Sequence, residues 1–116
     1  MEPKLRNGDY VSDQLGGIVR LEHEQALLQR VLYRLTARRG GFPLLPELGS
    51  ELYKLGRQLP GERLSAARQY VAQALEPEEI TVTDVKLSSA REGQMDLTVE
   101  LLYQGRELSA ALTILS

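Results

Sequence analysis

The sequence has no cysteine, no tryptophan and a single phenylalanine among its 116 residues. Without cysteine, the chain has no disulfide framework, thiol nucleophile or zinc–thiolate site. Aromatic residues make up 5% of the chain, which leaves few side chains for stacking on nucleic-acid bases. Basic residues are not in excess either, and the net charge of −2 disfavours a nucleic-acid partner. We therefore expect no metal, no cofactor and no nucleic acid.

Long hydrophobic runs are also missing. No apolar run approaches the roughly 20 residues that cross a bilayer, and residues 1–5 lack the basic-then-apolar pattern of a secretory signal. We expect a protein that is made and folded in the cytoplasm without a membrane partner. The length suits one domain with a modest core. Because residues 1–20 are poorly patterned, we predict an N-terminal extension over 1–20 and a single domain over 21–116.

The clearest pattern in the chain is a β-hairpin at its end. Apolar and polar residues alternate on both sides of Gln104-Gly105, which reads as a two-residue turn. That turn places four apolar pairs on one face. The predicted pairs are Leu101 with Leu108, Val99 with Ala110, Leu97 with Leu112, and Met95 with Ile114.

Helical periodicity fills the middle of the chain. Apolar residues recur at helical spacing over residues 22–39, over about 47–59 and over 62–75. A strand over 80–87 follows, with a phase change that predicts a β-bulge near Thr83-Asp84. A short strand over 18–21 is a further prediction. The expected fold is α+β, with three helices on one face of a three-stranded antiparallel sheet that ends in the hairpin, and with a short extra N-terminal strand.

The last strand is the first candidate for function. It has no downstream segment to cover it, so we expect it at the sheet edge, where free N–H and C=O groups can accept a strand from another chain. The alternative is a strand that is merely short, twisted or covered by the N-terminal segment. The predicted partner-binding residues are Glu107, Leu108, Ser109, Ala110, Ala111, Leu112, Thr113, Ile114 and Leu115.

Three other groups of polar residues invite a chemical interpretation. His23 has no further ligands at a suitable spacing, so we expect it to be solvated. Glu76, Glu78 and Glu79 cluster where the third helix ends, and two carboxyl groups across a cleft are what a glycosidase needs. We expect instead that Glu76 and Pro77 form a structural junction and that the other two carboxylates are solvated. The row Arg30, Arg34, Arg38 is either a solvated helix face or a contact for an acidic partner.

Several segments in order carry a family resemblance. They are residues 24–30 with Leu35-Thr36 and Gly40-Gly41, residues 46–52, residues 72–77, residues 80–82 and the terminal hairpin. Together they resemble the small baseplate proteins of contractile injection machines, often labelled tail-lysozyme-like and better described as sheath initiators. Members occur in contractile phage tails, phage-tail-like bacteriocins and type VI secretion baseplates. The resemblance runs from about residue 15 to the end of the chain.

The resemblance implies a role in assembly. The protein would be clamped by baseplate wedge subunits, and its last strand would be the template on which the first ring of sheath protein adds strands. It would reside in the cytoplasm of the bacterial host during assembly and then in the baseplate. The alternatives are a peptidoglycan-cleaving enzyme that uses Glu76 with Glu78 or Glu79, and an unrelated adaptor that self-associates through the edge strand.

Two positions depart from the family pattern. The family usually has arginine directly after its Glu-Pro pair, where this chain has Glu78, and an acidic residue after the glycine turn, where this chain has Phe42. Both changes weaken the transfer of a polar network to the junction. Glu76 in particular loses the neighbouring cation that the pattern expects. We therefore expect the protein not to be an enzyme.

Overall fold

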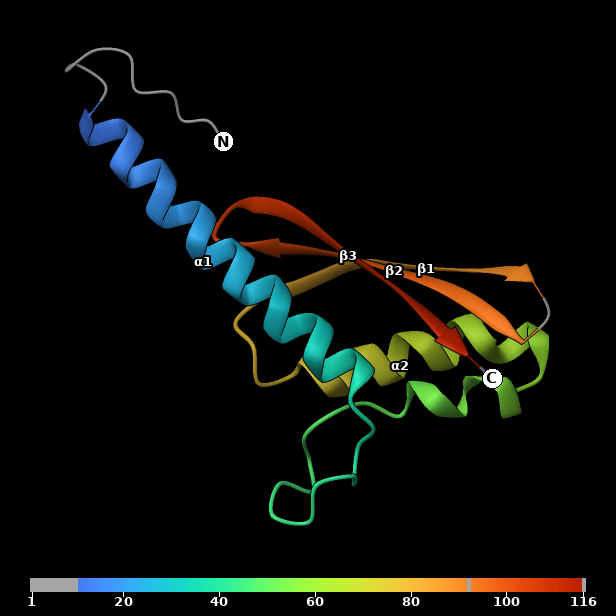
Figure 1. The fold of residues 1–116 in the computed structure, drawn as a ribbon. Helices are drawn as coiled ribbons and strands as arrows, with labels where there is room; N and C mark the ends of the chain where they lie inside the picture. Colours follow the sequence, from blue (N-terminus) through green and yellow to red (C-terminus); the bar gives the residue numbers. More distant parts are fainter. Residues whose placement is uncertain (1–10, 92, 116) are drawn as a thin grey trace. The chain divides into compact units, whose positions relative to one another are not determined.

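The computed structural model describes residues 11–91 and 93–115 (Figure 1). The chain divides into two compact units, residues 1–30 and residues 31–116. The helix α1 (Val11–Thr36) belongs to both units. Its residues 11–30 are the described part of the first unit, and its residues 31–36 belong to the second. None of the helices in the described part of the chain has the length and hydrophobicity to cross a membrane.

The helix α1 is longer at its start than the sequence indicates. The predicted strand over 18–21 is wrong, since those residues lie inside the helix, as do Gly16 and Gly17. A glycine inside a helix costs only about 1 kcal/mol relative to alanine. Arg20, Leu21 and Glu22 lose little side-chain freedom in a helix and favour its continuation. Residues 1–10 of the predicted N-terminal extension lie outside the described residues.

The chain leaves α1 after Thr36, earlier than the predicted end at Arg39. The Thr36 hydroxyl donates to the Leu32 carbonyl oxygen at 2.8 Å. Beyond it, Arg38 and Ser50 form a parallel β-bridge, in which the Arg39 N–H donates to the Ser50 carbonyl oxygen at 2.9 Å. This bridge closes the loop over residues 39–49 at its base.

The second predicted helix, over about 47–59, is shorter and of another type. Residues 47–51 are not helical, and the segment η2 (Leu52–Arg57) is a 3₁₀-helix. Leu52 and Leu55 are buried at a spacing of three residues, which suits the three residues per turn of a 3₁₀-helix. Leu59, predicted on the same face, is 67% exposed. The α-helical period was therefore the wrong interpretation of this leucine series.

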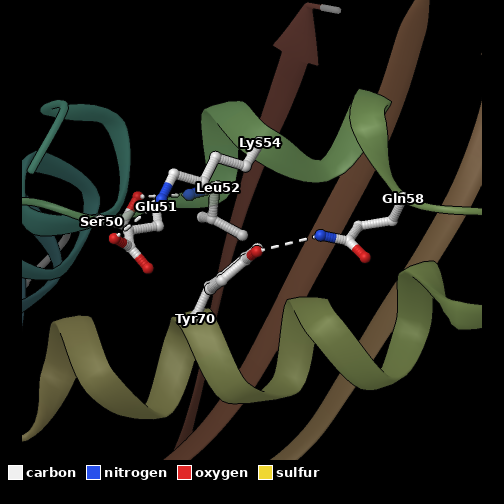
Figure 2. Close-up of polar contacts among 6 residues, drawn as sticks. All are labelled: Ser50, Glu51, Leu52, Lys54, Gln58 and Tyr70. Carbon is white, nitrogen blue, oxygen red and sulfur yellow. Dashed lines mark hydrogen bonds and ion pairs between the residues drawn. The ribbon is translucent and has the colours of Figure 1, made fainter.

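The third predicted helix is confirmed. A short 3₁₀ turn, η3 (Pro60–Glu62), leads into the α-helix α2 (Arg63–Leu75). Figure 2 shows how α2 is tied to η2: the Gln58 side-chain amide donates to the Tyr70 hydroxyl at 3.2 Å. The buried residues of α2 are Ala67, Val71, Ala74 and Leu75.

The sheet has three antiparallel strands in the order β1-β2-β3. Their bounds are β1 (Thr81–Arg91), β2 (Gln94–Tyr103) and β3 (Arg106–Leu115). The helix α2 packs against β1 and η2 packs against β3, on the same face of the sheet in Figure 1. The predicted α+β class and the antiparallel sheet are confirmed. The central strand β2 carries much of the core, with Met95, Leu97, Val99 and Leu101 all buried.

The register of the hairpin also agrees with the sequence. Gln104 and Gly105 have φ values of 51° and 81°, as expected for a two-residue turn with both central residues left-handed. All four predicted pairs are observed, from Leu101 opposite Leu108 to Met95 opposite Ile114. The predicted bulge is present as a register shift between Val82 and Asp84.

Candidate functional site: the open edge of the sheet

The strand β3 lies at one edge of the sheet. Its partner is β2, and among the described residues no second strand pairs with it. The η2 segment packs against it, on the side of the core. The edge position that the sequence predicts for residues 107–115 is therefore the one the structure has.

The turn decides which backbone groups of β3 point outward. In a two-residue hairpin the pair that flanks the turn, here Tyr103 and Arg106, is hydrogen-bonded, and bonded and non-bonded pairs then alternate along the ladder. Even-numbered residues of β3 therefore direct their N–H and C=O groups toward β2. The odd-numbered residues direct theirs to the open edge. They are Glu107, Ser109, Ala111, Thr113 and Leu115.

The two faces of β3 differ in character. On the core face, Ala110 and Ile114 are buried, while Leu108 and Leu112 are only half-buried. The two leucines are thus apolar residues whose burial is incomplete at this edge. On the other face, residues 107, 109, 111, 113 and 115 are exposed, and the three in the middle are small. A strand added beside β3 would extend both faces without displacing a large side chain.

The opposite edge of the sheet is less suited to pairing. Strand β1 has register shifts at two places, between Val82 and Asp84 and between Ser89 and Arg91. Bulges are one way in which proteins protect a sheet edge from other strands. The register of β3 with β2 is continuous, and β3 contains neither lysine nor proline.

Hydrogen bonds organise the polar face of the sheet. The Lys86 ammonium donates to Glu100 at 3.0 Å, and this hydrogen bond raises the pKa of Lys86 above its ordinary value. The Thr113 hydroxyl donates to the Asp96 carboxylate at 3.2 Å. Glu107 lies next to the turn, and together with Glu100 it lines a shallow hollow.

The junction after α2 is built differently from the prediction. Glu76 is exposed at the C-terminal end of α2. Glu78, which we expected to be solvated, has a side chain that is only 8% exposed and accepts a hydrogen bond from Arg34 Nε at 2.8 Å. The prediction treated the arginine row and the acidic cluster separately. The signal that it missed is their opposite charge, which pairs one member of each group.

Removing Arg34 is expected to destabilise the domain. In an Arg34→Met variant the aliphatic volume remains, but the poorly exposed Glu78 carboxylate loses a charged donor, which should cost about 1–3 kcal/mol. Urea unfolding followed by circular dichroism measures the loss. The control is Lys86→Met, which removes a surface ion pair whose two side chains are both exposed and should leave the free energy of unfolding nearly unchanged. Equal losses in the two variants would contradict the structural role of Arg34.

An open groove of about 620 Å³ lies beside the junction. Its lining is largely apolar, and Glu47 is the one carboxylate among the residues that line it: Arg34, Leu44, Leu45, Pro46, Glu47, Leu48 and Pro77. The groove therefore lacks the facing pair of carboxyl groups that glycoside hydrolysis requires. Among the described residues there is also no group of three or more His, Asp or Glu side chains placed to hold a metal ion.

The remaining candidates from the sequence are His23 and the arginine row. His23 lies on α1 with an exposed side chain. The guanidinium of Arg38 sits 4.0 Å from the centroid of the Tyr53 ring. Both this cation–π contact and the Arg34 ion pair join an arginine of the row to another residue of the same protein. Of the two interpretations of the arginine row, the solvated face does not hold for Arg34, whose side chain is 24% exposed and is paired with Glu78.

Comparisons with known proteins bear on the fold. No protein-family model and no curated protein sequence matched the chain. Among solved structures, it is similar to one described as a "putative tail lysozyme" from Geobacter sulfurreducens, with a TM-score of 0.61 and 17% sequence identity. The alignment covers 81% of this chain and 93% of that one. The likeness shows a tail-lysozyme-like fold.

Proposed function

We propose that this protein is a structural component of the baseplate of a contractile injection machine, of the sheath-initiator type. Its strand β3 starts sheath assembly by pairing with a strand of the sheath protein. The observation that carries the proposal is the open edge of β3, a ten-residue strand with continuous register and outward-facing backbone groups from Glu107 to Leu115. The tail-lysozyme-like fold and the ordered family segments in the sequence support it.

Strand addition suits a joint that bears load. Main-chain hydrogen bonds supply affinity in a fixed direction, and alternate side chains supply the register. Here Leu108 and Leu112, half-buried at the edge, would be covered by apolar side chains of the incoming strand. Baseplate wedge subunits would hold the rest of the domain. Assembly would take place in the cytoplasm of the bacterial host, and the finished protein would remain in the baseplate of the tail.

Reconstitution tests the proposal. The gene is expected to lie among genes for sheath, tube and spike proteins, which supplies the sheath protein to use. Sheath protein on tail tubes is incubated with and without this protein bound to a baseplate, and sheath assembly is followed by electron microscopy. Sheath that starts at the baseplate only when this protein is present supports the proposal. Equal assembly without it contradicts it.

The proposal assigns no catalytic role to the protein. Glu76 is exposed, Glu78 is paired with Arg34, and the neighbouring groove is largely apolar, with Glu47 as the one carboxylate in its lining. A glycosidase needs an acid of raised pKa opposite a second carboxylate across the sugar. We expect purified protein to leave the turbidity of a peptidoglycan suspension unchanged, as will Glu76→Gln. Clearing by the wild type that is lost in Glu76→Gln would instead establish the enzyme.

A further inference from the structure

We infer that two copies of this chain pair through their β3 edges, antiparallel and centred on Ala111. The inference rests on the geometry of β3 and not on the proposed function. The edge that would receive a sheath strand is self-complementary in one register, and three features of the strand select that register.

The first feature is the set of outward backbone groups. These belong to the odd-numbered residues from Glu107 to Leu115, a set that is symmetric about Ala111. Antiparallel pairing centred on Ala111 places Ala111 opposite itself, Ser109 opposite Thr113 and Glu107 opposite Leu115. Every outward N–H and C=O group of one copy then meets a group of the other. A shift in either direction leaves some of these groups without a partner strand.

The second feature is the core face. In the same register, Leu108 of one copy lies beside Ile114 of the other, and Ala110 lies beside Leu112. Both leucines are half-buried in the single chain, so pairing removes their remaining apolar surface from water. Opposite residues across antiparallel strands have Cβ atoms about 4.5–5.5 Å apart, close enough for these contacts. The apolar rows of the two copies therefore join into one.

The third feature is charge. Glu107 is the only acidic residue of β3, and like charges directly opposite each other oppose strand pairing. Centring on Ala111 separates the two copies of Glu107 by about 27 Å along the strands, at about 3.4 Å per residue. A register centred nearer the turn would bring them together. The small residues at the centre, with Ser109 opposite Thr113, leave room for close approach on the polar face.

The pairing has a consequence for assembly. A two-fold dimer of this kind is closed, since each copy uses the same edge. The dimer would satisfy the outward backbone groups of β3 and prevent this long edge from pairing with incorrect partners. A sheath strand would then bind by displacing the second copy. The dimer should therefore dissociate when sheath protein is added in excess.

Single cysteines test the register directly, because the natural chain has none. In Ala111→Cys the two Cα atoms would be about 5.5 Å apart, within the range of a disulfide. In Ser109→Cys or Thr113→Cys alone, the two copies of the cysteine would be about 14 Å apart, too far to bond. A mixture of the last two variants, one carrying an affinity tag, brings unlike cysteines opposite each other.

We expect Ala111→Cys to form a disulfide-linked dimer under mild oxidation and the mixture to form a tagged–untagged dimer. The single Ser109→Cys and Thr113→Cys variants should remain largely monomeric on a non-reducing gel. Equal cross-linking of all three single variants would overturn the register. Wild-type protein that sediments as a monomer at several hundred micromolar, with no Ala111→Cys dimer, would overturn the self-pairing and leave the proposed sheath contact standing.

Discussion

Replacing Ala111 by proline is expected to weaken strongly the pairing of β3 with another strand while leaving the domain folded. The N–H of Ala111 points to the open edge, so proline removes no hydrogen bond to β2. Proline is tolerated on edge strands in this orientation. For an incoming strand, the same change removes a donor at the centre of the ladder and places the ring where the strand must approach.

Sheath nucleation is the readout for this variant. One lost hydrogen bond is worth about 1 kcal/mol and the ring adds a steric penalty, so the initiation rate should fall roughly tenfold or more. Ala111→Ser retains the N–H and the small size, and it should nucleate sheath like the wild type. Normal initiation by a folded Ala111→Pro variant would show that β3 is not the site of strand addition.

The neighbouring residue supplies a second control. Ala110 is 4% exposed and directs its N–H toward β2. Ala110→Pro therefore breaks the hairpin ladder and should cost about 3 kcal/mol or more of stability. The contrast between adjacent positions tests the backbone alternation on which the edge assignment depends. If Ala110→Pro were the milder of the two in urea unfolding, the outward and inward residues would be the reverse of those inferred.

Deleting the last strand is a poorer test of function. Ala110 and Ile114 are buried, and the whole of β3 pairs with β2. A deletion of residues 109–116 would uncover Leu97 and Val99 at the centre of the core. Loss of sheath nucleation in such a variant would not distinguish a missing edge from an unfolded domain. Proline at residue 111 separates these two effects.

The hairpin shows what local sequence can determine. Two apolar rows of period two and one turn of two residues are sufficient to specify the register, because a slip by one residue would turn each row away from the core. The bulge in β1 could also be predicted from local sequence. Val82 precedes it, Val85 and Leu87 follow it, and only an extra residue between them places all three on one face.

The strand predicted over 18–21 was an error of local propensity, whereas the helix predicted over about 47–59 depends on contacts distant in sequence. Residues 47–59 contain leucines at both α-helical and 3₁₀ spacing, and the sequence alone favours neither. The choice is made by the bridge between Arg38 and Ser50, which holds residue 50 in an extended backbone and delays the helix to Leu52. The Arg34–Glu78 pair likewise joins residues 44 positions apart. The spacing of residues within one element cannot predict a pair between two distant elements.

Gly49 is the residue on which this bridge depends, and Gly49→Ala is expected to be strongly destabilising. The backbone of Gly49 has φ of +102°, and an added Cβ would lie 2.6 Å from the Ala37 carbonyl oxygen and 2.9 Å from the Arg38 carbonyl carbon. These are backbone atoms that cannot rotate away. Strain of this conformation alone costs about 1–3 kcal/mol for a residue with a side chain.

Moving the backbone to relieve the clash would break buried hydrogen bonds. The Ser50 N–H donates to the Ala37 carbonyl oxygen at 2.8 Å, and the Ser50 hydroxyl donates to the Leu35 carbonyl oxygen at 2.6 Å. Ser50 is 2% exposed, so water cannot readily replace these bonds. Each buried group left without a partner costs about 1–3 kcal/mol. We expect a total loss of about 3 kcal/mol or more in urea unfolding.

Two other glycines separate the conformational cost from the close approach. Gly40 has φ of +87° with no atom within 4 Å of an added Cβ, so Gly40→Ala should lose only about 1 kcal/mol. Gly61 has neither feature, and Gly61→Ala should be neutral or slightly stabilising. The expected order of stability is Gly61→Ala, then Gly40→Ala, then Gly49→Ala. A Gly49→Ala variant as stable as Gly40→Ala would show that the loop moves freely away from residues 37–39. The bridge would then not be what delays the helix to Leu52.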